Sequence, residues 1–379
     1  MKITELQTKE ERAELLNETV KSFKERAQEH DENLTFPFEN FKELKEIGYP
    51  ALTLPKEYGG AGISLTEMLH LQAIIGKADG STALSIGWHM GIIKHLGENK
   101  SWDEETFQRV AKDVVENGAL LNNAASEPAT GSPTRGGKPE TYAKETENGW
   151  IINGRKTFTT LAPILDYFVV SASIDGTDDV GNFLIQRDLT GVSIDETWDS
   201  IAMRGTGSHD LVLENVHVEK DALVEYRKPK KEAAGWLLHI PACYLGIALA
   251  AQEYANHFAR TYSPNSMDKS KTISDFPNVK QKMGEMELSV LEAKHFLFSV
   301  ARKWDEADDE TRQTMGSELG AVKLSVVNKA IHIVDLAMRI TGARSLSQAN
   351  PLQRYYRDVR AGLHNPPMDD MTIMNLASG

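Results

Sequence analysis

The chain has 379 residues, a length that suits two or three domains. Apolar residues make up 40% and charged residues 26% of the sequence, which is ordinary for a globular protein with a sizeable core. The formal net charge of −13 argues against a nucleic-acid-binding protein, because such proteins normally present a basic surface. The single cysteine, Cys243, excludes an intrachain disulfide and a cysteine-rich zinc site, and we predict no bound metal.

The N-terminal residues are polar and lack the apolar core of a signal peptide. No window approaches the length of about 18 uninterrupted apolar residues that a membrane span requires. We therefore expect a cytoplasmic protein that interacts with neither membrane nor nucleic acid.

Helical spacing dominates the first third of the chain. Residues 5–30 are dense in Glu, Lys, Arg and Leu, and a further helix is expected over residues 38–47. Ser64 and Glu67 stand three apart before an apolar run, which is the capping-box pattern of a helix start. The following helix, about residues 81–96, has no polar face, so we expect it to be buried.

The middle of the chain changes to a β pattern. Two Asn-Gly pairs, at 148–149 and 153–154, are flanked by β-forming residues, which predicts two tight turns. The strands expected from these turns and from the spacing of apolar residues cover 142–146, 150–152, 155–160, 167–174, 182–186, 192–194 and 209–218. A block of this kind forms a β barrel or sandwich.

From Lys231 onward the helical period returns, with apolar stripes typical of a helix bundle. The predicted fold class is therefore α+β, with a helical domain over residues 1–118, a β-barrel domain over 119–230 and a four-helix bundle over 231–379. Strands and helices do not alternate as in a Rossmann fold, and the sequence has no GxGxxG.

Four segments resemble the acyl-CoA dehydrogenase superfamily in sequence, order and spacing. They are LPKEYGGAG (54–62), SEPATGS (126–132), INGRKTF (152–158) and MRGTGSHD (203–210). The resemblance extends over nearly the whole chain. It implies the fold just described and an FAD-dependent oxidoreductase of fatty acid metabolism, usually assembled as a homotetramer.

The resemblance also implies where the cofactor binds, between the β domain and the C-terminal helices. The cofactor-binding residues it implies are Asn123, Ala125, Ser126, Phe158, Thr160, Arg260, Arg339 and Gly342. Ser132 is similar to a serine that contacts the CoA phosphate arm, so a substrate-binding role is implied for it. Alternatives remain for several of these, because Ser126 could be a turn residue, Phe158 a core aromatic and Arg260 a solvated surface residue.

The sequence departs from the family at the catalytic base. The family's usual glutamate follows Arg-Asp by a few residues, and here that position holds Pro366, which cannot accept a proton. A minority of the family has the glutamate on the first helix of the last domain, where this chain has Trp236 and only Glu232 nearby. Asp369 and Asp370 are the nearest carboxylates after the missing base.

The segment Leu363-His364-Asn365-Pro366 is similar instead to a branch of flavin-dependent monooxygenases, which use reduced flavin and O2. The resemblance implies that His364 faces the flavin, and that His89 approaches it from the buried helix of the first domain. Histidine suits proton transfer because its pKa lies near neutrality. We therefore predict His364 and His89 as catalytic residues, while a hydrogen-bonded core histidine remains the alternative for each.

Three functions are consistent with these residues. The first is an FAD-dependent acyl-CoA dehydrogenase that acts on an acyl-CoA or another small molecule and passes electrons to an acceptor such as an electron-transfer flavoprotein. The second is a monooxygenase, for which FMN is possible and a flavin reductase is the expected partner. The third is a flavin-binding module without turnover.

Overall fold

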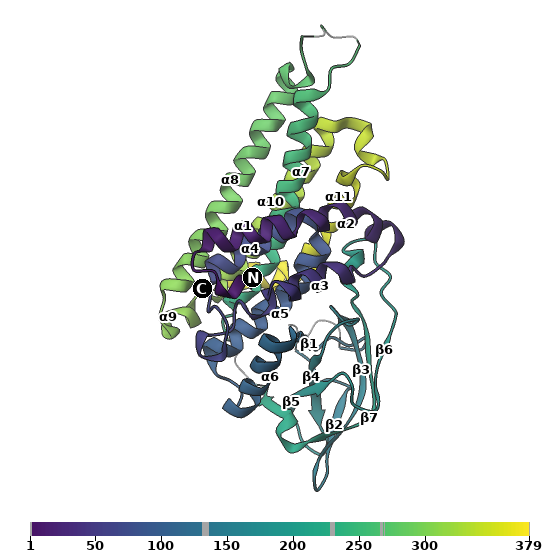
Figure 1. The fold of residues 1–379 in the computed structure, drawn as a ribbon, viewed down its shortest axis with the longest axis vertical. Coiled ribbons are helices and arrows are strands. Elements are labelled where there is room, and N and C mark those ends of the chain that lie inside the picture. Colours follow the sequence, from purple (N-terminus) through teal and green to yellow (C-terminus); the bar gives the residue numbers. More distant parts are fainter. Residues whose placement is uncertain (1, 131–135, 228–231, 266–267, 269, 379) are drawn as a thin grey trace.

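The computed structural model describes residues 2–130, 136–227, 232–265, 268 and 270–378 (Figure 1). Within them helices come first, strands second and helices again last, so the predicted α, β, α architecture is confirmed. The N-terminal helices are α1 (Lys9–Thr19), α2 (Lys21–Asn33), α3 (Phe38–Glu46), α4 (Leu65–Ala78), α5 (Gly80–Asn99) and α6 (Glu104–Asn117). The helical segment expected over residues 5–30 is thus divided at Val20, and α5 is buried as expected.

The strands form one eight-stranded sheet with the order β6-β7-β3-β2-β4-β5-β8, and β1 pairs with β4. The strands are β1 (Leu121–Ala124), β2 (Tyr142–Glu145), β3 (Gly149–Thr159), β4 (Tyr167–Ile174), β5 (Val180–Gln186), β6 (Val192–Asp195), β7 (His209–Glu219) and β8 (Leu223–Tyr226). The terminal strands β6 and β8 do not pair with each other in the described residues.

One of the two predicted Asn-Gly turns is wrong. The pair at 148–149 joins β2 to β3, but Asn153 and Gly154 lie inside β3, which is one continuous strand. The pairing of β3 with β7 shifts register between Ile152 and Gly154, as in a β-bulge. A Cβ atom on Gly154 would lie 2.4 Å from Thr141 Oγ1, so glycine is required there for close backbone approach.

The C-terminal part contains three long helices that pack along one another, together with shorter ones (Figure 1). They are α7 (His239–Thr261), α8 (Pro277–Glu306), α9 (Asp309–Thr314), α10 (Gly316–Thr341), α11 (Pro351–Ala361) and α12 (Asp369–Ser378). The segment Gly235–Thr261 is the one described helix long and apolar enough to cross a membrane, but 78% of its apolar window is buried inside the protein. It therefore has the character of a core helix.

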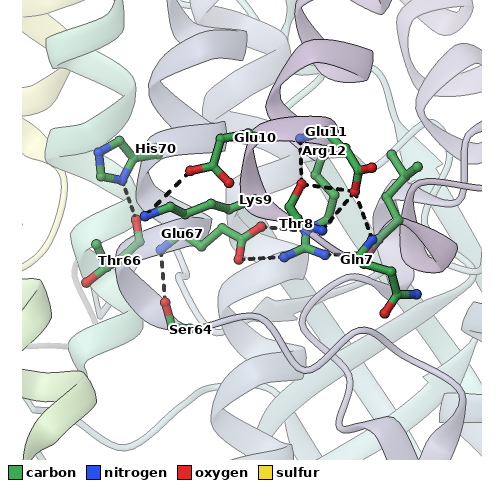
Figure 2. A network of polar contacts seen from close by, with 11 residues as sticks. Gln7, Thr8, Lys9, Glu10, Glu11, Arg12, Ser64, Thr66, Glu67 and His70 are labelled. Atoms are coloured by element: carbon green, nitrogen blue, oxygen red, sulfur yellow. Dashed lines mark hydrogen bonds and ion pairs between the residues drawn. The ribbon is translucent and has the colours of Figure 1, made fainter.

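The first turn of α4 joins the two helical parts. Ser64 Oγ accepts a hydrogen bond from the Glu67 N–H, as the capping pattern predicts, but the Glu67 carboxylate turns instead to Arg12 on α1 (Figure 2). Arg12 donates two hydrogen bonds to it, at 2.6 and 3.0 Å. From α8, the Asp305 carboxylate accepts the N–H groups of Leu65 and Thr66 at 2.7 and 2.9 Å. Asp305 thus caps α4 from the other end of the sequence.

Substitution of Arg12 by methionine is expected to lower the free energy of unfolding by about 2–3 kcal/mol, because it leaves the largely buried Glu67 carboxylate without its partner. Urea denaturation measures the change. Lys21→Met is the matched control, since its ion pair with Glu18 is exposed and its loss is expected to cost less than about 0.5 kcal/mol. Equal losses in both variants would contradict a special role for the Arg12–Glu67 pair.

Candidate functional site

A buried ion pair fixes the segment that follows β1. Lys156 Nζ, on β3, donates to Glu127 Oε1 at 2.5 Å, and both side chains are almost completely buried. The two Glu127 oxygens also accept the backbone N–H groups of Glu140 and Thr141 at 2.6 and 3.0 Å. Next to this pair the Thr157 N–H donates to the Ser126 carbonyl at 2.9 Å. Residues 125–127 are therefore held firmly against β3.

Both members of this pair carry their charge. Burial opposes ionisation of Glu127, but the hydrogen bonds from Lys156 and Thr141 and the lysine charge outweigh it and lower the pKa of Glu127. Burial lowers the pKa of Lys156, and the Glu127 carboxylate opposes that shift. Sequence reasoning missed both residues as functional, although each lies in a motif that it used. The sequence carried no signal that pairs them, because Glu127 follows β1 in a polar stretch and Lys156 has polar neighbours in β3.

The segment held by this pair presents the predicted residues to the outside. Asn123 is exposed, and Ala125 and Ser126 are half-buried. Phe158, close to the end of β3, is 67% exposed and has a left-handed backbone with φ +56°. That conformation is unfavourable for an aromatic residue, and strained residues of this kind gather at functional sites. Phe158 contacts Trp198 edge-on, with ring centroids 6.0 Å apart, and the rest of its ring is open to a ligand.

Thr160 belongs to a chain of buried hydroxyl groups. Its Oγ1 lies 2.9 Å from Ser208 Oγ, which lies 2.8 Å from Thr206 Oγ1. Asn122 Nδ2 donates to the Thr160 carbonyl at 3.0 Å and so ties β1 to the end of β3. Thr159 Oγ1, next to them, is buried and has no hydrogen-bond partner in the part of the chain that the structure describes. Sequence reasoning did not select Asn122, Thr206 or Ser208.

His89 joins three elements. It lies on α5 and is completely buried, and the Leu121 N–H of β1 donates to its Nδ1 at 3.1 Å. Nε2 therefore carries the proton and donates to the Pro50 carbonyl at 3.1 Å. Burial lowers the pKa of His89 to about 4, so the ring is neutral. In this arrangement both nitrogens are occupied by backbone groups, which gives the ring the contacts of a structural residue.

The end of α11 approaches the β domain. Asp358 is buried and its Oδ1 accepts the Met203 N–H at 2.7 Å, while burial raises the pKa of Asp358 to about 7. Arg357 forms a bidentate pair with Asp31 of α2 at 3.0 and 2.5 Å and also donates to the Ile201 carbonyl. The segment that leads to Thr206 and Ser208 is therefore attached to both helical parts of the chain.

The short helix η10 (Gly362–His364) follows α11. His364 is exposed, and Asn365 and Pro366 after it are half-buried. The Tyr244 hydroxyl of α7 donates to Asn365 Oδ1 at 2.5 Å. The structure therefore brings the histidine predicted to be catalytic and the proline at the expected base position to one turn, beside a buried tyrosine.

The nearest carboxylates after the expected base position are Asp369 and Asp370, and both lie on α12. Asp369 Oδ1 accepts from the buried Lys323 Nζ at 3.0 Å, which fixes α12 to α10. Asp370 is exposed on the first turn of α12. Trp236 lies in the short helix η7 (Gly235–Leu238) and packs against other aromatic rings. Ser132, predicted to bind substrate, lies outside the described residues.

The other predicted cofactor residues lie on the C-terminal helices. Arg260 is exposed in the last turn of α7, and Figure 1 shows that end of α7 at the opposite end of the molecule from the strands. Arg339 and Gly342 are exposed at the end of α10 and line a surface cavity of about 470 Å³ together with Tyr356 and Arg360. The structure thus brings residues 123–126, 158 and 160 together within one chain and leaves these three apart from them.

The three domain models of the acyl-CoA dehydrogenase family match this chain in order: the N-terminal domain over residues 6–101, the middle domain over 122–216 and the C-terminal domain over 238–365. The chain is 53% identical to YdbM of Bacillus subtilis, which carries an acyl-CoA dehydrogenase name, over 96% of this chain and 95% of that one. The chain therefore belongs to the acyl-CoA dehydrogenase family, and the resemblance found in the sequence is confirmed.

Two further comparisons widen the range of chemistry among similar proteins. The chain is 30% identical to a 3-(aryl)acrylate reductase of Clostridium sporogenes, over 92% of this chain and 93% of that one. Its fold is similar to that of TdsC from Paenibacillus sp. A11-2, solved with FMN and indole, with a TM-score of 0.86 and 25% identity over 97% and 96% of the two chains.

Proposed function

We propose that this chain is an FAD-dependent oxidoreductase that acts on the bond between the α and β carbons of an acyl group, as an acyl-CoA dehydrogenase does. The single observation that carries the proposal is the exposed, strained Phe158 beside the rigidly held segment 125–127, in a chain that belongs to the acyl-CoA dehydrogenase family. The name of the relative that reduces 3-(aryl)acrylates supports action on a carbon–carbon bond next to an acyl carbon.

The residues of the site fit a flavin. Phe158 offers an aromatic face for a planar ring, and backbone groups near Ser126 and the hydroxyl of Thr160 offer hydrogen bonds. The hydroxyl of Thr159 and the Nε of Arg204 are buried and have no hydrogen-bond partner among the described residues, so a bound group could satisfy them. When bound, a flavin supplies hydride transfer at N5. The task of the residues around it is to orient the ring and the acyl group and to exclude water.

The remaining cofactor assignments belong to the same proposal. Arg260 cannot reach the Phe158 region of its own chain and would serve a neighbouring copy in the homotetramer that we expect. Arg339, Gly342 and Arg360 line one cavity, in which Arg360 pairs with Asp335 and Arg339 is the guanidinium group that suits a phosphate. The expected electron acceptor is an electron-transfer flavoprotein, and the expected location is the cytoplasm.

The first test is direct. The purified protein is expected to bind FAD, and a suitable saturated acyl-CoA is expected to bleach the oxidised flavin absorbance under anaerobic conditions. Phe158→Ala is expected to weaken FAD binding by about tenfold, because an aromatic contact of about 1–1.5 kcal/mol is lost. Tyr142→Ala removes another exposed β-strand aromatic and is the matched control. A protein that takes up no flavin would overturn the proposal.

A second candidate function is a flavin-dependent monooxygenase, favoured by His364 and by Pro366 at the position where a dehydrogenase has its base. His364 is exposed on the turn beside Tyr244, where solvent can reach it. Oxygen-dependent product with supplied reduced flavin, and no bleaching by any acyl-CoA, would favour this function. In either case His364→Ala is expected to lower kcat by about 100-fold or more, because general acid–base catalysis contributes about 10²–10⁴.

A further inference from the structure

The turn at the end of β3 holds the backbone of Thr160 in one place. Phe158 and Leu161, on either side of it, both have left-handed backbones, with φ +56° and +69°. The Thr160 N–H donates to the Phe158 carbonyl at 2.9 Å, and the Leu161 N–H donates to the Thr206 carbonyl at 3.1 Å. Asn122 Nδ2 donates to the Thr160 carbonyl at 3.0 Å. These contacts fix the backbone, and the direction of the Thr160 hydroxyl proton depends on the side chains around it.

The Thr160 hydroxyl is one end of a chain of three. Thr160 Oγ1 lies 2.9 Å from Ser208 Oγ, which lies 2.8 Å from Thr206 Oγ1. In the order Thr160, Ser208, Thr206 these residues are 9%, 5% and 1% exposed, so Thr160 is the least buried of them. Each hydroxyl has one proton to donate, and the chain joins its three members by two hydrogen bonds. One proton is therefore left over and needs an acceptor outside the chain.

Burial decides which hydroxyl carries the remaining proton. If the chain ran from Thr160 toward Thr206, that proton would lie on the most deeply buried member, whose hydroxyl has no second partner among the described residues. If both threonines donated to Ser208, the serine proton would lack an acceptor in the same way. A buried donor without an acceptor costs about 1–3 kcal/mol. The order that avoids this cost runs from Thr206 through Ser208 to Thr160 and leaves the Thr160 proton free for a bound group.

We infer that Ser208 is a positioning residue, whose hydroxyl donates to Thr160 Oγ1 and so directs the Thr160 proton to an acceptor atom of the flavin ring. The inference rests on the proposed function, in which the Thr160 hydroxyl is one of the groups offered to the flavin, and adds the residue that orients it. Hydrogen bonds in a chain polarise one another, so a hydroxyl that accepts from Ser208 is a stronger donor. A directed donor stabilises the negative charge that the ring gains on reduction and raises its reduction potential.

The test measures the midpoint potential of FAD bound to the full chain. Ser208→Ala removes the donor and is expected to lower the affinity for reduced FAD, relative to oxidised FAD, about threefold, a fall of about 15 mV for a two-electron couple. Ser208→Thr keeps a hydroxyl and is expected to keep the wild-type potential. Ser208→Cys puts a weak donor of similar size in the same place, so a smaller fall is expected even if the alanine variant does not fold.

A double-variant cycle shows whether Ser208 acts through Thr160. Thr160→Val is expected to lower the same affinity ratio about tenfold, and in that background Ser208→Ala is expected to change the potential no further. A merely structural serine would change the melting temperature alone. Ser173→Ala is the matched control, because it removes another buried hydroxyl of the β domain, which donates to the Pro139 carbonyl at 2.6 Å. It is expected to lower the melting temperature and to leave the potential unchanged.

Two failures can be told apart. Normal FAD uptake with the wild-type potential in Ser208→Ala, or a fall of the same size in the Thr160→Val background, would overturn the inference and leave the proposed function standing. A potential in Ser208→Thr as low as that of the alanine variant would do the same. Wild-type protein that takes up no FAD would overturn the proposed function, and this inference with it.

Discussion

Lys156→Met is expected to lower the free energy of unfolding by about 3–5 kcal/mol and to abolish tight flavin binding. The methionine fills most of the volume of the lysine but leaves the Glu127 carboxylate buried without its counter-charge, 2.5 Å from where the ammonium stood. Glu127 also fixes the N–H groups of Glu140 and Thr141, so the segment that presents Ser126 loses its anchor. Denaturation by urea and titration with FAD measure the two effects.

The controls for this prediction are close in sequence. Arg155→Met changes the preceding residue, whose pairs with Asp195 and Asp210 lie at the surface, and is expected to cost less than about 1 kcal/mol. The double variant Glu127→Gln, Lys156→Met removes both charges and keeps an acceptor for one of the two backbone N–H groups. It is expected to regain part of the lost stability, because no unpaired charge remains buried. A double variant as unstable as the single one would show that packing, not charge, dominates.

The order of helices and strands was predictable because the spacing of apolar residues and the identity of turn residues can be read from short stretches of sequence. The strands at 167–174 and 209–218 and the cap at Ser64 agree with the structure for this reason. Asn153-Gly154 misled because Asn-Gly favours a tight turn and a bulge alike, and only pairing with β7 decides between them. The strand β1 was missed because two of its four residues are asparagine, which is rare in strands.

The candidate site was only partly predictable. Motif similarity selected Ser126, Phe158 and Thr160, which the fold gathers at one end of β3, but it could not reveal that Phe158 has a left-handed backbone. Nor could it pair Lys156 with Glu127. The two residues are 29 positions apart in sequence, and only the three-dimensional arrangement of the chain brings them into contact. His89 matched a motif, yet its backbone contacts with Pro50 and Leu121 come from tertiary structure alone.

Acid is expected to destabilise the protein by about 3 kcal/mol for each of two buried histidines by about pH 4. Burial lowers the pKa of His89 to about 4 and that of His239 to about 3, from 6.5. Below about pH 6.5 the unfolded chain binds a proton on each imidazole while the folded chain does not, so the free energy of unfolding falls as the pH falls. The loss of stability due to His89 ends near pH 4, its pKa in the folded protein, and the loss due to His239 continues to about pH 3. Urea denaturation over this pH range measures both.

His239→Leu separates the two contributions. Neither ring nitrogen of His239 has a hydrogen-bond partner in the described residues, and the ring lies 4.9 Å from Trp88, so leucine removes a titrating group without breaking a hydrogen bond. The variant is expected to lose only about half as much stability in acid as the wild type. His332→Leu, at an exposed position of α10, is expected to leave the acid loss unchanged. If His239→Leu is as acid-sensitive as the wild type, the imidazole is protonated in the folded protein, and a group that stabilises its charge must lie beside it.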